Sequence, residues 1–265
     1  MNNVRLLEKY GPWAMVTGAS DGIGAAFADY LASAGFSVVL VARRADRLND
    51  LAERLRNQHG VNTLAVAADL ATSEGLLAVD EATASVDVGM YVASAGYGTS
   101  GPIIKADLEQ EHNMLEVNCF ALLHHTIVFG RRFALRGRGG IILMSSLVGW
   151  QGTPNSAHYA ATKAYVQSLA ESLSVEWKTL NIDVVASAPG PVHSGFAKRA
   201  DMRMNTAVTP AVVAKHSLHA LGRRSTVIPG ALSKLLTYSL APLPRFLRTR
   251  ILGQVMGGMT RHQVA

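Results

Sequence analysis

Three side chains in the middle of the chain have the types and spacing needed for proton transfer. Tyr159 and Lys163 are four residues apart in a run of helical composition, so both leave the same face of one helix. The Lys163 ammonium favours the charged phenolate form of Tyr159, and the cationic ring of a neighbouring cofactor would favour it further. Both would move the pKa of the phenol toward neutrality. Ser146 closes the apolar run GGIILMSS, a predicted buried strand, where its hydroxyl can hydrogen-bond a carbonyl oxygen. The set predicts general acid/base chemistry at a carbonyl.

The spacing of these residues resembles a known family. A serine followed thirteen residues later by Tyr159-Ala-Ala-Thr-Lys163 is similar to the short-chain dehydrogenase/reductase family. That family uses the serine, tyrosine and lysine for hydride transfer, so the resemblance implies an oxidoreductase. It also implies that Asn118 is a fourth catalytic residue, holding a water that relays protons to the lysine. The alternative is a helix-interior amide that bonds neighbouring backbone.

A glycine-rich turn near the N-terminus predicts a dinucleotide site. Residues 13–18 read as a short apolar strand, and an amphipathic helical run follows the glycines. In this context the first glycine permits the tight turn, the second lets backbone approach a pyrophosphate, and the third allows close helix packing. The free N–H groups of the helix N-terminus would face the phosphates. The turn matches the TGxxxGxG form of the family, and its predicted cofactor-binding residues are Gly18, Ser20, Asp21, Gly22, Ile23 and Gly24.

The end of the second predicted strand, residues 36–42, indicates which dinucleotide binds. An NAD site usually has a carboxylate there for the ribose 2′-hydroxyl, whereas this chain has Arg43 and Arg44. A guanidinium is a fixed fork of donors suited to a phosphate, so we predict NADP(H) and assign Arg43 to it. The alternative is that both arginines only open a solvated helix, and we make no assignment for Arg44.

The next two predicted strands also end in candidate cofactor contacts. Asp69 and Leu70 follow the third strand, and the resemblance implies that Asp69 bonds the adenine amino group. The alternative is a turn residue ahead of the helix that starts near Ser73. The fourth strand ends in Ala-Ser-Ala-Gly96 where the family usually has NNAG, which leaves open how the centre of the sheet is stabilised. Gly96 permits close approach to the adenine ribose.

Beyond the predicted catalytic helix, the strand over residues 182–188 leads into the sequence PGPVHS. This resembles the PGxVxT segment of the family, which implies contacts to the nicotinamide carboxamide from the backbone and from the hydroxyl of the last residue. The residues assigned to it are Pro189, Gly190, Val192 and Ser194, joined by Tyr159 and Lys163 as ribose contacts. Residues 195–210 are small, polar and basic, typical of a mobile lid over substrate.

The order of elements predicts an α/β fold with a single doubly wound, Rossmann-type parallel sheet and helices on both faces. The predicted elements include a long helix over residues 107–133 and a short last strand over residues 225–229. Ligands then bind beyond the carboxyl ends of the strands. We expect one domain over residues 1–265, with 231–265 as a basic helical C-terminal extension. The resemblance covers about residues 12–230.

Composition supports this fold and narrows the setting. The 265 residues are 49% hydrophobic and 17% charged, which argues against disorder and suits a sheet covered on both faces. Cys119 is the single cysteine, so an intrachain disulfide is excluded; we expect it to be buried in a reducing, cytoplasmic protein. Neither a signal peptide nor a transmembrane helix is expected.

Positive charge is concentrated near the C-terminus. Residues 202–265 contain nine Lys or Arg and no acid, against 16 basic and 19 acidic residues before them. Two short apolar stripes in residues 231–259 are separated by Pro242 and Pro244. They predict either a cover for a subunit or substrate pocket, or a basic amphipathic patch on anionic membrane. No recognition motif for nucleic acid is visible.

The chain has three histidines on one predicted helical run, His112, His124 and His125. The sequence places no carboxylate or cysteine near them at a ligand spacing. We therefore interpret them as surface or packing residues and predict no metal.

Together these features predict an NADP(H)-dependent oxidoreductase that interconverts a ketone and a secondary alcohol. Its substrate would be hydrophobic, such as a steroid, a long acyl chain or a xenobiotic ketone; a β-ketoacyl thioester also fits the basic C-terminal region. The alternative is an NADPH-binding regulatory or scaffold protein without turnover. The resemblance implies a homodimer or homotetramer. The candidate pocket walls are Tyr97, Leu147, Val148, Trp150, Gln151, His158, Pro191 and Phe196.

Overall fold

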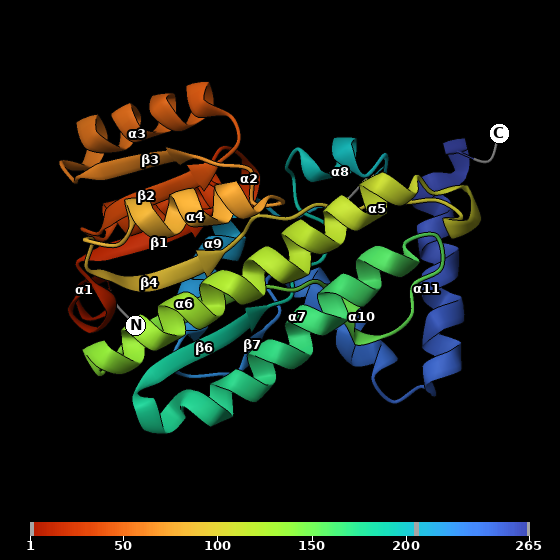
Figure 1. Cartoon of the computed structure of the whole chain (residues 1–265). Helices are drawn as coiled ribbons and strands as arrows, with labels where there is room; N and C mark the ends of the chain where they lie inside the picture. The colour runs from red at the N-terminus through yellow and green to blue at the C-terminus, as the bar shows by residue number, and fades with distance from the viewer. Residues whose placement is uncertain (1–2, 204–206, 264–265) are drawn as a thin grey trace.

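Seven parallel strands form one sheet in a computed structural model, which describes residues 3–203 and 207–263. The strand order is β3-β2-β1-β4-β5-β6-β7, so the chain winds outward in both directions from β1 and β4. The strands are β1 (Trp13–Thr17), β2 (Ser37–Ala42), β3 (Thr63–Ala67), β4 (Val88–Ala93), β5 (Gly139–Met144), β6 (Ile182–Ser187) and β7 (Thr226–Val227). The predicted doubly wound parallel sheet is confirmed (Figure 1).

Helices connect successive strands and continue past the last one. The α-helices are α1 (Asn3–Tyr10), α2 (Gly22–Ser33), α3 (Ala45–His59), α4 (Ser73–Ala82), α5 (Leu108–Leu115), α6 (Ala121–Arg136), α7 (Ala157–Glu176), α8 (Phe196–Arg199), α9 (Pro210–Ala220), α10 (Ala231–Leu240) and α11 (Arg245–Thr260). A π-helical turn, η2 (Glu116–Phe120), joins α5 to α6, and a 3₁₀ turn, η3 (Leu147–Trp150), follows β5.

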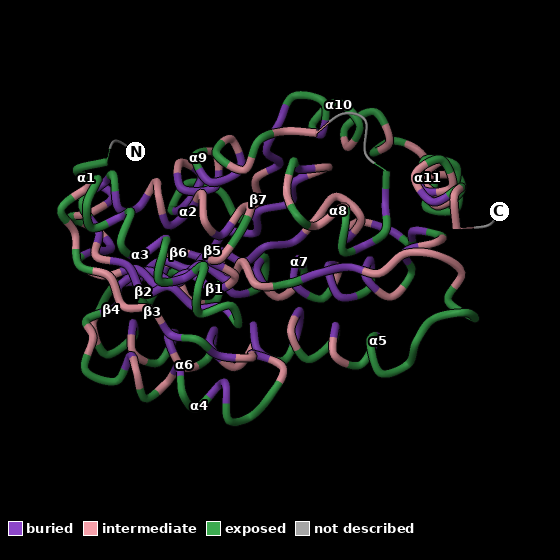
Figure 2. Tube along the Cα trace, turned by 90° about the horizontal axis from the view of Figure 1, so that it is seen from above, coloured by how far each residue is buried: buried purple, intermediate pink, exposed green. Residues whose placement is uncertain are grey.

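The sheet separates two apolar cores. On one face, α2, α3 and α9 contribute fully buried side chains such as Leu31, Leu48 and Leu218. On the other, α4, α6 and α7 contribute Val79, Phe129 and Val166. Figure 2 shows the buried strands lying between the two helical layers. Every residue of β4 and β5 is buried, as expected for central strands of a parallel sheet.

Two predicted elements differ in detail from the observed ones. The last strand, predicted over residues 225–229, pairs with β6 only through Thr226 and Val227. The long helix predicted over residues 107–133 is interrupted by η2, which widens the turn around the buried Asn118. Such π-turns often mark functional sites, because they redirect a side chain out of the helical ladder. Part of the predicted lid, residues 204–206, lies outside the described residues.

The C-terminal helices α10 and α11 lie beyond the carboxyl ends of the strands (Figure 1). Helix α11 packs Met256 against Ala200 and Met202, next to α8. Among the described residues, no helix combines the length and the apolar character needed to cross a bilayer.

Candidate active site

A cavity of about 870 Å³ opens at the carboxyl ends of the strands. Its wall brings together Gly18, Asp69, Gly96, Ser146 and Pro189, which come from five separate strand ends. Parallel strands present their carboxyl ends at one edge of the sheet, so residues far apart in sequence meet there. All the predicted site residues line this cavity except Asn118, which lies behind the wall and is fully buried.

Tyr159 and Ser146 form the polar centre of the cavity. Tyr159 is buried on the first turn of α7, and burial raises the pKa of its phenol to about 12, while a hydrogen bond with Ser146 opposes the rise. The sequence predicts a shift toward neutrality through Lys163 and through the cationic ring of a bound cofactor. In the structure the Lys163 ammonium lies 5.7 Å from the centre of the tyrosine ring and donates to the Met144 carbonyl (2.9 Å). The phenol therefore keeps its proton at neutral pH and is poised as an acid.

Lys163 is itself strongly affected by burial. Loss of solvent lowers the pKa of its ammonium to about 8, against a smaller opposite influence from Cys119. Cys119 is a free, buried thiol, as expected from the sequence. The lysine is therefore charged at neutral pH and loses its charge only slightly above it.

Asn118 is held by three hydrogen bonds. Its amide nitrogen donates to the Tyr97 carbonyl (2.8 Å) and to the Thr162 hydroxyl (3.1 Å), and its oxygen accepts from the Tyr97 backbone N–H (3.0 Å). A Cβ atom at Gly96 would lie 2.8 Å from the Asn118 oxygen and 3.4 Å from the Lys163 nitrogen. The asparagine thus fixes the backbone after β4 beside the lysine. Its predicted water-relay role stays a prediction.

The glycine turn leaves a wall of bare backbone. Gly18 and Gly22 both have positive φ (68° and 53°), which favours glycine. A Cβ atom at Gly18 would lie 2.8 Å from the Ala95 nitrogen, and one at Gly22 would lie 2.8 Å from Cβ of Ser194. Asp21 caps α2 by accepting from the Gly22 N–H (2.7 Å). The turn has the shape of a phosphate cradle at a helix N-terminus.

Basic side chains border this cradle. Arg43 is half-exposed and lies 3.9 Å from the Asp69 carboxylate. Arg44, left unassigned from sequence, also lines the cavity and donates to the Ser20 hydroxyl (3.0 Å). Three further basic residues in the wall were not predicted: Arg47, Lys198 and Arg199. Arg47 follows Arg43 by one helical turn, a spacing that would have indicated it; the other two come from α8, whose position the sequence does not reveal.

The departure from the family pattern at the end of β4 is compensated by Thr17. Its hydroxyl accepts from the backbone N–H groups of Ser94 and Ala95, both at 3.1 Å, and donates to the Val92 carbonyl at 3.4 Å. The Thr17 side chain at the end of β1 thereby fixes the position of the loop that follows β4.

Five of the eight predicted pocket walls line the cavity: Tyr97, Leu147, Val148, Pro191 and Phe196. The prediction is wrong for the other three. His158 turns away and pairs with the Glu111 carboxylate (2.6 Å), tying α7 to α5. Gln151 bonds the carbonyl of the preceding turn, and Trp150 is absent from the wall. These residues lie close in sequence to the catalytic candidates, but closeness in sequence does not determine whether a side chain points into the cavity or away from it.

The remaining apolar wall comes from the C-terminal extension. Helices α10 and α11 contribute Leu236, Leu252, Val255, Met256 and Met259. Of the two interpretations of this extension, the structure therefore favours a cover over the pocket.

Comparisons with known proteins agree with this geometry. The family model for short chain dehydrogenases matches residues 12–205. The chain is 30% identical over 236 residues to a 7beta-hydroxysteroid dehydrogenase of Mediterraneibacter gnavus, covering 86% of this chain and 90% of that one. It is 34% identical over 187 residues to a very-long-chain 3-oxoacyl-CoA reductase of Pyricularia oryzae, covering 69% of this chain and 56% of that one.

Solved structures give the same result. A 7beta-hydroxysteroid dehydrogenase superimposes with a TM-score of 0.87 at 29% identity, covering 94% of this chain and 99% of that one. A short-chain dehydrogenase from Sphingobium yanoikuyae in complex with NADPH gives 0.79 at 28% identity, covering 88% and 94%. The chain therefore belongs to the short-chain dehydrogenase/reductase family, which makes it an oxidoreductase acting on alcohol and carbonyl groups rather than a cofactor sensor.

Proposed function

We propose that this protein is an NADP(H)-dependent reductase that converts a bulky hydrophobic ketone to a secondary alcohol at neutral pH. The observation that carries the proposal is a single cavity in which the protonated phenol of Tyr159 lies between a glycine cradle with basic borders and an apolar wall.

The cofactor fits the first part of that cavity. Gly18 and Gly22 shape a backbone turn at the N-terminus of α2 that suits a pyrophosphate, and a side chain at either position would meet neighbouring protein atoms at 2.8 Å. Arg43 and Arg44 offer guanidinium donors to a 2′-phosphate, which favours NADP(H) over NAD. When bound, the cofactor supplies the hydride. The NADPH complex of the related Sphingobium yanoikuyae enzyme supports this assignment.

The protein's own groups would handle the substrate oxygen and its proton. Ser146 donates a hydrogen bond to the carbonyl oxygen without competing for the proton. Tyr159 then gives its phenolic proton to that oxygen as the alcohol forms. Lys163, charged below about pH 8, stabilises the resulting phenolate and offers donors to ribose hydroxyls. Asn118 positions the backbone of Tyr97 and the loop beside the lysine.

Replacing Tyr159 with phenylalanine tests the catalytic assignment. Tyr159→Phe should lower kcat for NADPH-linked ketone reduction by about 10²- to 10⁴-fold, the usual contribution of a general acid. NADPH affinity, measured by fluorescence titration, should change little. Tyr165→Phe, on the exposed side of the same helix, is the matched control and should keep full activity. Retention of most activity by Tyr159→Phe would remove this residue from the mechanism.

For the substrate we favour a rigid, steroid-like ketone over an acyl thioester. The apolar wall from α10 and α11 suits a ring system, and the match to the hydroxysteroid dehydrogenase extends over 90% of that enzyme. The match to the 3-oxoacyl-CoA reductase covers 56% of its length. Initial rates with a panel of steroid ketones, 3-oxoacyl-CoA thioesters and small aryl ketones would rank the classes. Higher kcat/KM with the thioesters would contradict the steroid assignment.

The cellular setting is a further proposal. We expect a cytoplasmic homodimer or homotetramer, measurable by light scattering. Peripheral membrane contact is the remaining alternative for the C-terminal extension, since Leu235, Tyr238 and Phe246 are each at least 64% exposed beside basic residues. Sedimentation with anionic vesicles tests it, comparing the wild type with a variant in which these three residues are serine. Equal pelleting would exclude the contact.

A further inference from the structure

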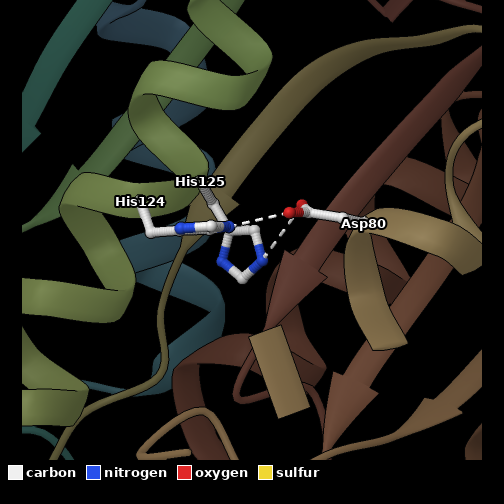
Figure 3. Close-up of side chains that lie close together, drawn as sticks. All are labelled: Asp80, His124 and His125. Carbon is white, nitrogen blue, oxygen red and sulfur yellow. Dashed lines mark hydrogen bonds and ion pairs between the residues drawn. The ribbon is translucent and has the colours of Figure 1, made fainter. Parts of the chain in front are cut away.

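A second polar cluster lies on the outer side of the molecule, away from the cavity. Asp80 on α4 faces His124 and His125 on α6 (Figure 3). His124 Nε2 is 2.7 Å from one Asp80 carboxylate oxygen, and His125 Nε2 is 3.8 Å from the other. None of the three residues lines the cavity. The sequence offers these histidines no nearby carboxylate, and packing of α4 on α6 supplies one from 44 residues away.

Hydrogen bonding leaves this cluster incomplete. The His124–Asp80 bond uses one carboxylate oxygen, while the other oxygen of Asp80 and both ring nitrogens of His125 are buried without a hydrogen-bond partner of normal geometry. The His125 ring makes only a weaker contact with the Ala121 backbone. His125 is fully buried, packed against Tyr91 and Phe129. Buried polar atoms nearly always have partners, so three unpaired atoms at one point mark a place for a water or an ion. A hydrogen bond between the two helices would explain why His124 lies beside Asp80, but it would not explain why the His125 ring is buried there.

We propose that Asp80, His124 and His125 bind a divalent transition metal of the zinc class. Each residue offers one ligand atom, and the three atoms lie within 4.8 Å of one another. Bonds of about 2.0–2.2 Å at tetrahedral angles would separate the ligand atoms by about 3.4 Å. The 2.7 Å and 3.8 Å contacts join the two histidines to different oxygens of Asp80, so the carboxylate would have to rotate until one oxygen lies at this separation from both nitrogens. Water would complete the shell.

The donor set decides the class of ion. Two imidazoles and one carboxylate suit zinc, cobalt or nickel, whereas magnesium and calcium prefer shells of oxygen alone. The positive charge of Arg132 lies nearby and would repel a cation. Its guanidinium, however, donates hydrogen bonds to the backbone carbonyls of Asp80 and Thr83 and to the Thr83 hydroxyl.

The expected consequence is structural. A metal held by one residue of α4 and two of α6 would clamp these helices together on their face of the sheet. Side chains of Asp80 and His124 are 22% and 28% exposed, which gives the ion a path from solvent. The clamp would change stability without changing the chemistry at Tyr159.

Metal titration of the untagged full-length protein tests the proposal. The protein is first treated with EDTA, which is then removed. Added Co²⁺ should give a visible d–d absorption band that saturates at one equivalent of metal per chain, and added Zn²⁺ should displace the Co²⁺ and abolish the band. A hundredfold excess of Zn²⁺ over its Kd should raise Tm by about 5 °C. Asp80→Asn, which keeps the size and hydrogen-bonding capacity of the side chain, should weaken Co²⁺ binding at least tenfold and abolish the Tm rise.

Two further variants separate the site from the other histidines. His112→Asn, at an exposed position of α5, should bind metal like the wild type. His125→Phe should fill the same apolar space, keep NADPH binding and a folded Tm, and lose the metal response. A wild type that shows no Co²⁺ band, or the same response in wild type and Asp80→Asn, would overturn the proposal.

Discussion

The two walls of the cavity are built in different ways. The wall proposed for the cofactor, here called the cofactor wall, depends on backbone: Gly18 follows β1, and Gly22, four residues later in the same turn, begins α2. The apolar wall proposed for the substrate, here called the substrate wall, depends on side chains from distant segments, since Leu147 and Leu252 both line it although more than a hundred residues separate them. A backbone turn has a local sequence signature, whereas an assembled wall does not. The comparison predicts that changes to each wall will affect different kinetic constants.

The largest effect should come from adding a side chain to the cofactor wall. Gly22→Val would place its Cβ 2.8 Å from Cβ of Ser194 at a φ of 53°, so the turn must shift away from its phosphate-binding shape to relieve crowding and strain on the order of 3 kcal/mol. NADPH should bind about 100-fold more weakly by fluorescence titration. Gly60→Ala is the control, because that glycine also has positive φ but has nothing within 4 Å of the added atom. If Gly22→Val bound NADPH as tightly as the wild type, the bare backbone of the glycine turn would not be required for cofactor binding.

A smaller loss is expected where the cofactor wall uses charge. Arg43→Ala should raise KM for NADPH about tenfold and leave KM for NADH nearly unchanged, because a half-exposed guanidinium is partly screened by solvent. Arg56→Ala, at the far end of α3 where it bonds Thr63, should alter neither constant. Equal changes for both cofactors would show that Arg43 does not read the 2′-phosphate.

The pH profile tests the group lying between the two walls. The pKa of Lys163 is lowered to about 8, so its charge is complete below that pH and is lost above it, while Tyr159 stays protonated until about pH 12. For ketone reduction, kcat/KM should therefore be level from pH 6 to 7 and fall by up to about tenfold per unit above pH 8. A profile level to pH 10 would contradict the role of the lysine charge.

The smallest change should follow from trimming the substrate wall. Leu252→Ala on α11 should raise KM for a hydrophobic ketone about fivefold, through loss of about 1 kcal/mol of apolar contact, with NADPH affinity unchanged. Leu235→Ala, on the exposed face of α10, should have no effect on either constant. If both variants behave alike, the extension does not shape the pocket.

The sequence by itself predicted the sheet, the family and most residues that line the glycine-turn side of the cavity. The alternation of apolar strands with helices is a local periodicity, and the glycine turn and the Tyr159–Lys163 spacing are local patterns. They can therefore be recognised in the sequence without knowledge of the tertiary structure. The division into one domain with a C-terminal extension stays a prediction, as do the individual catalytic roles.

Tertiary structure alone decided what depends on contacts between distant residues and on loss of solvent. It set the high pKa of Tyr159, because burial outweighs the opposing hydrogen bond with Ser146. It turned His158 toward Glu111 and away from the cavity. It also brought Asp80 beside His124 and His125, because packing of two helices on one face of a sheet joins side chains that no spacing along the chain connects.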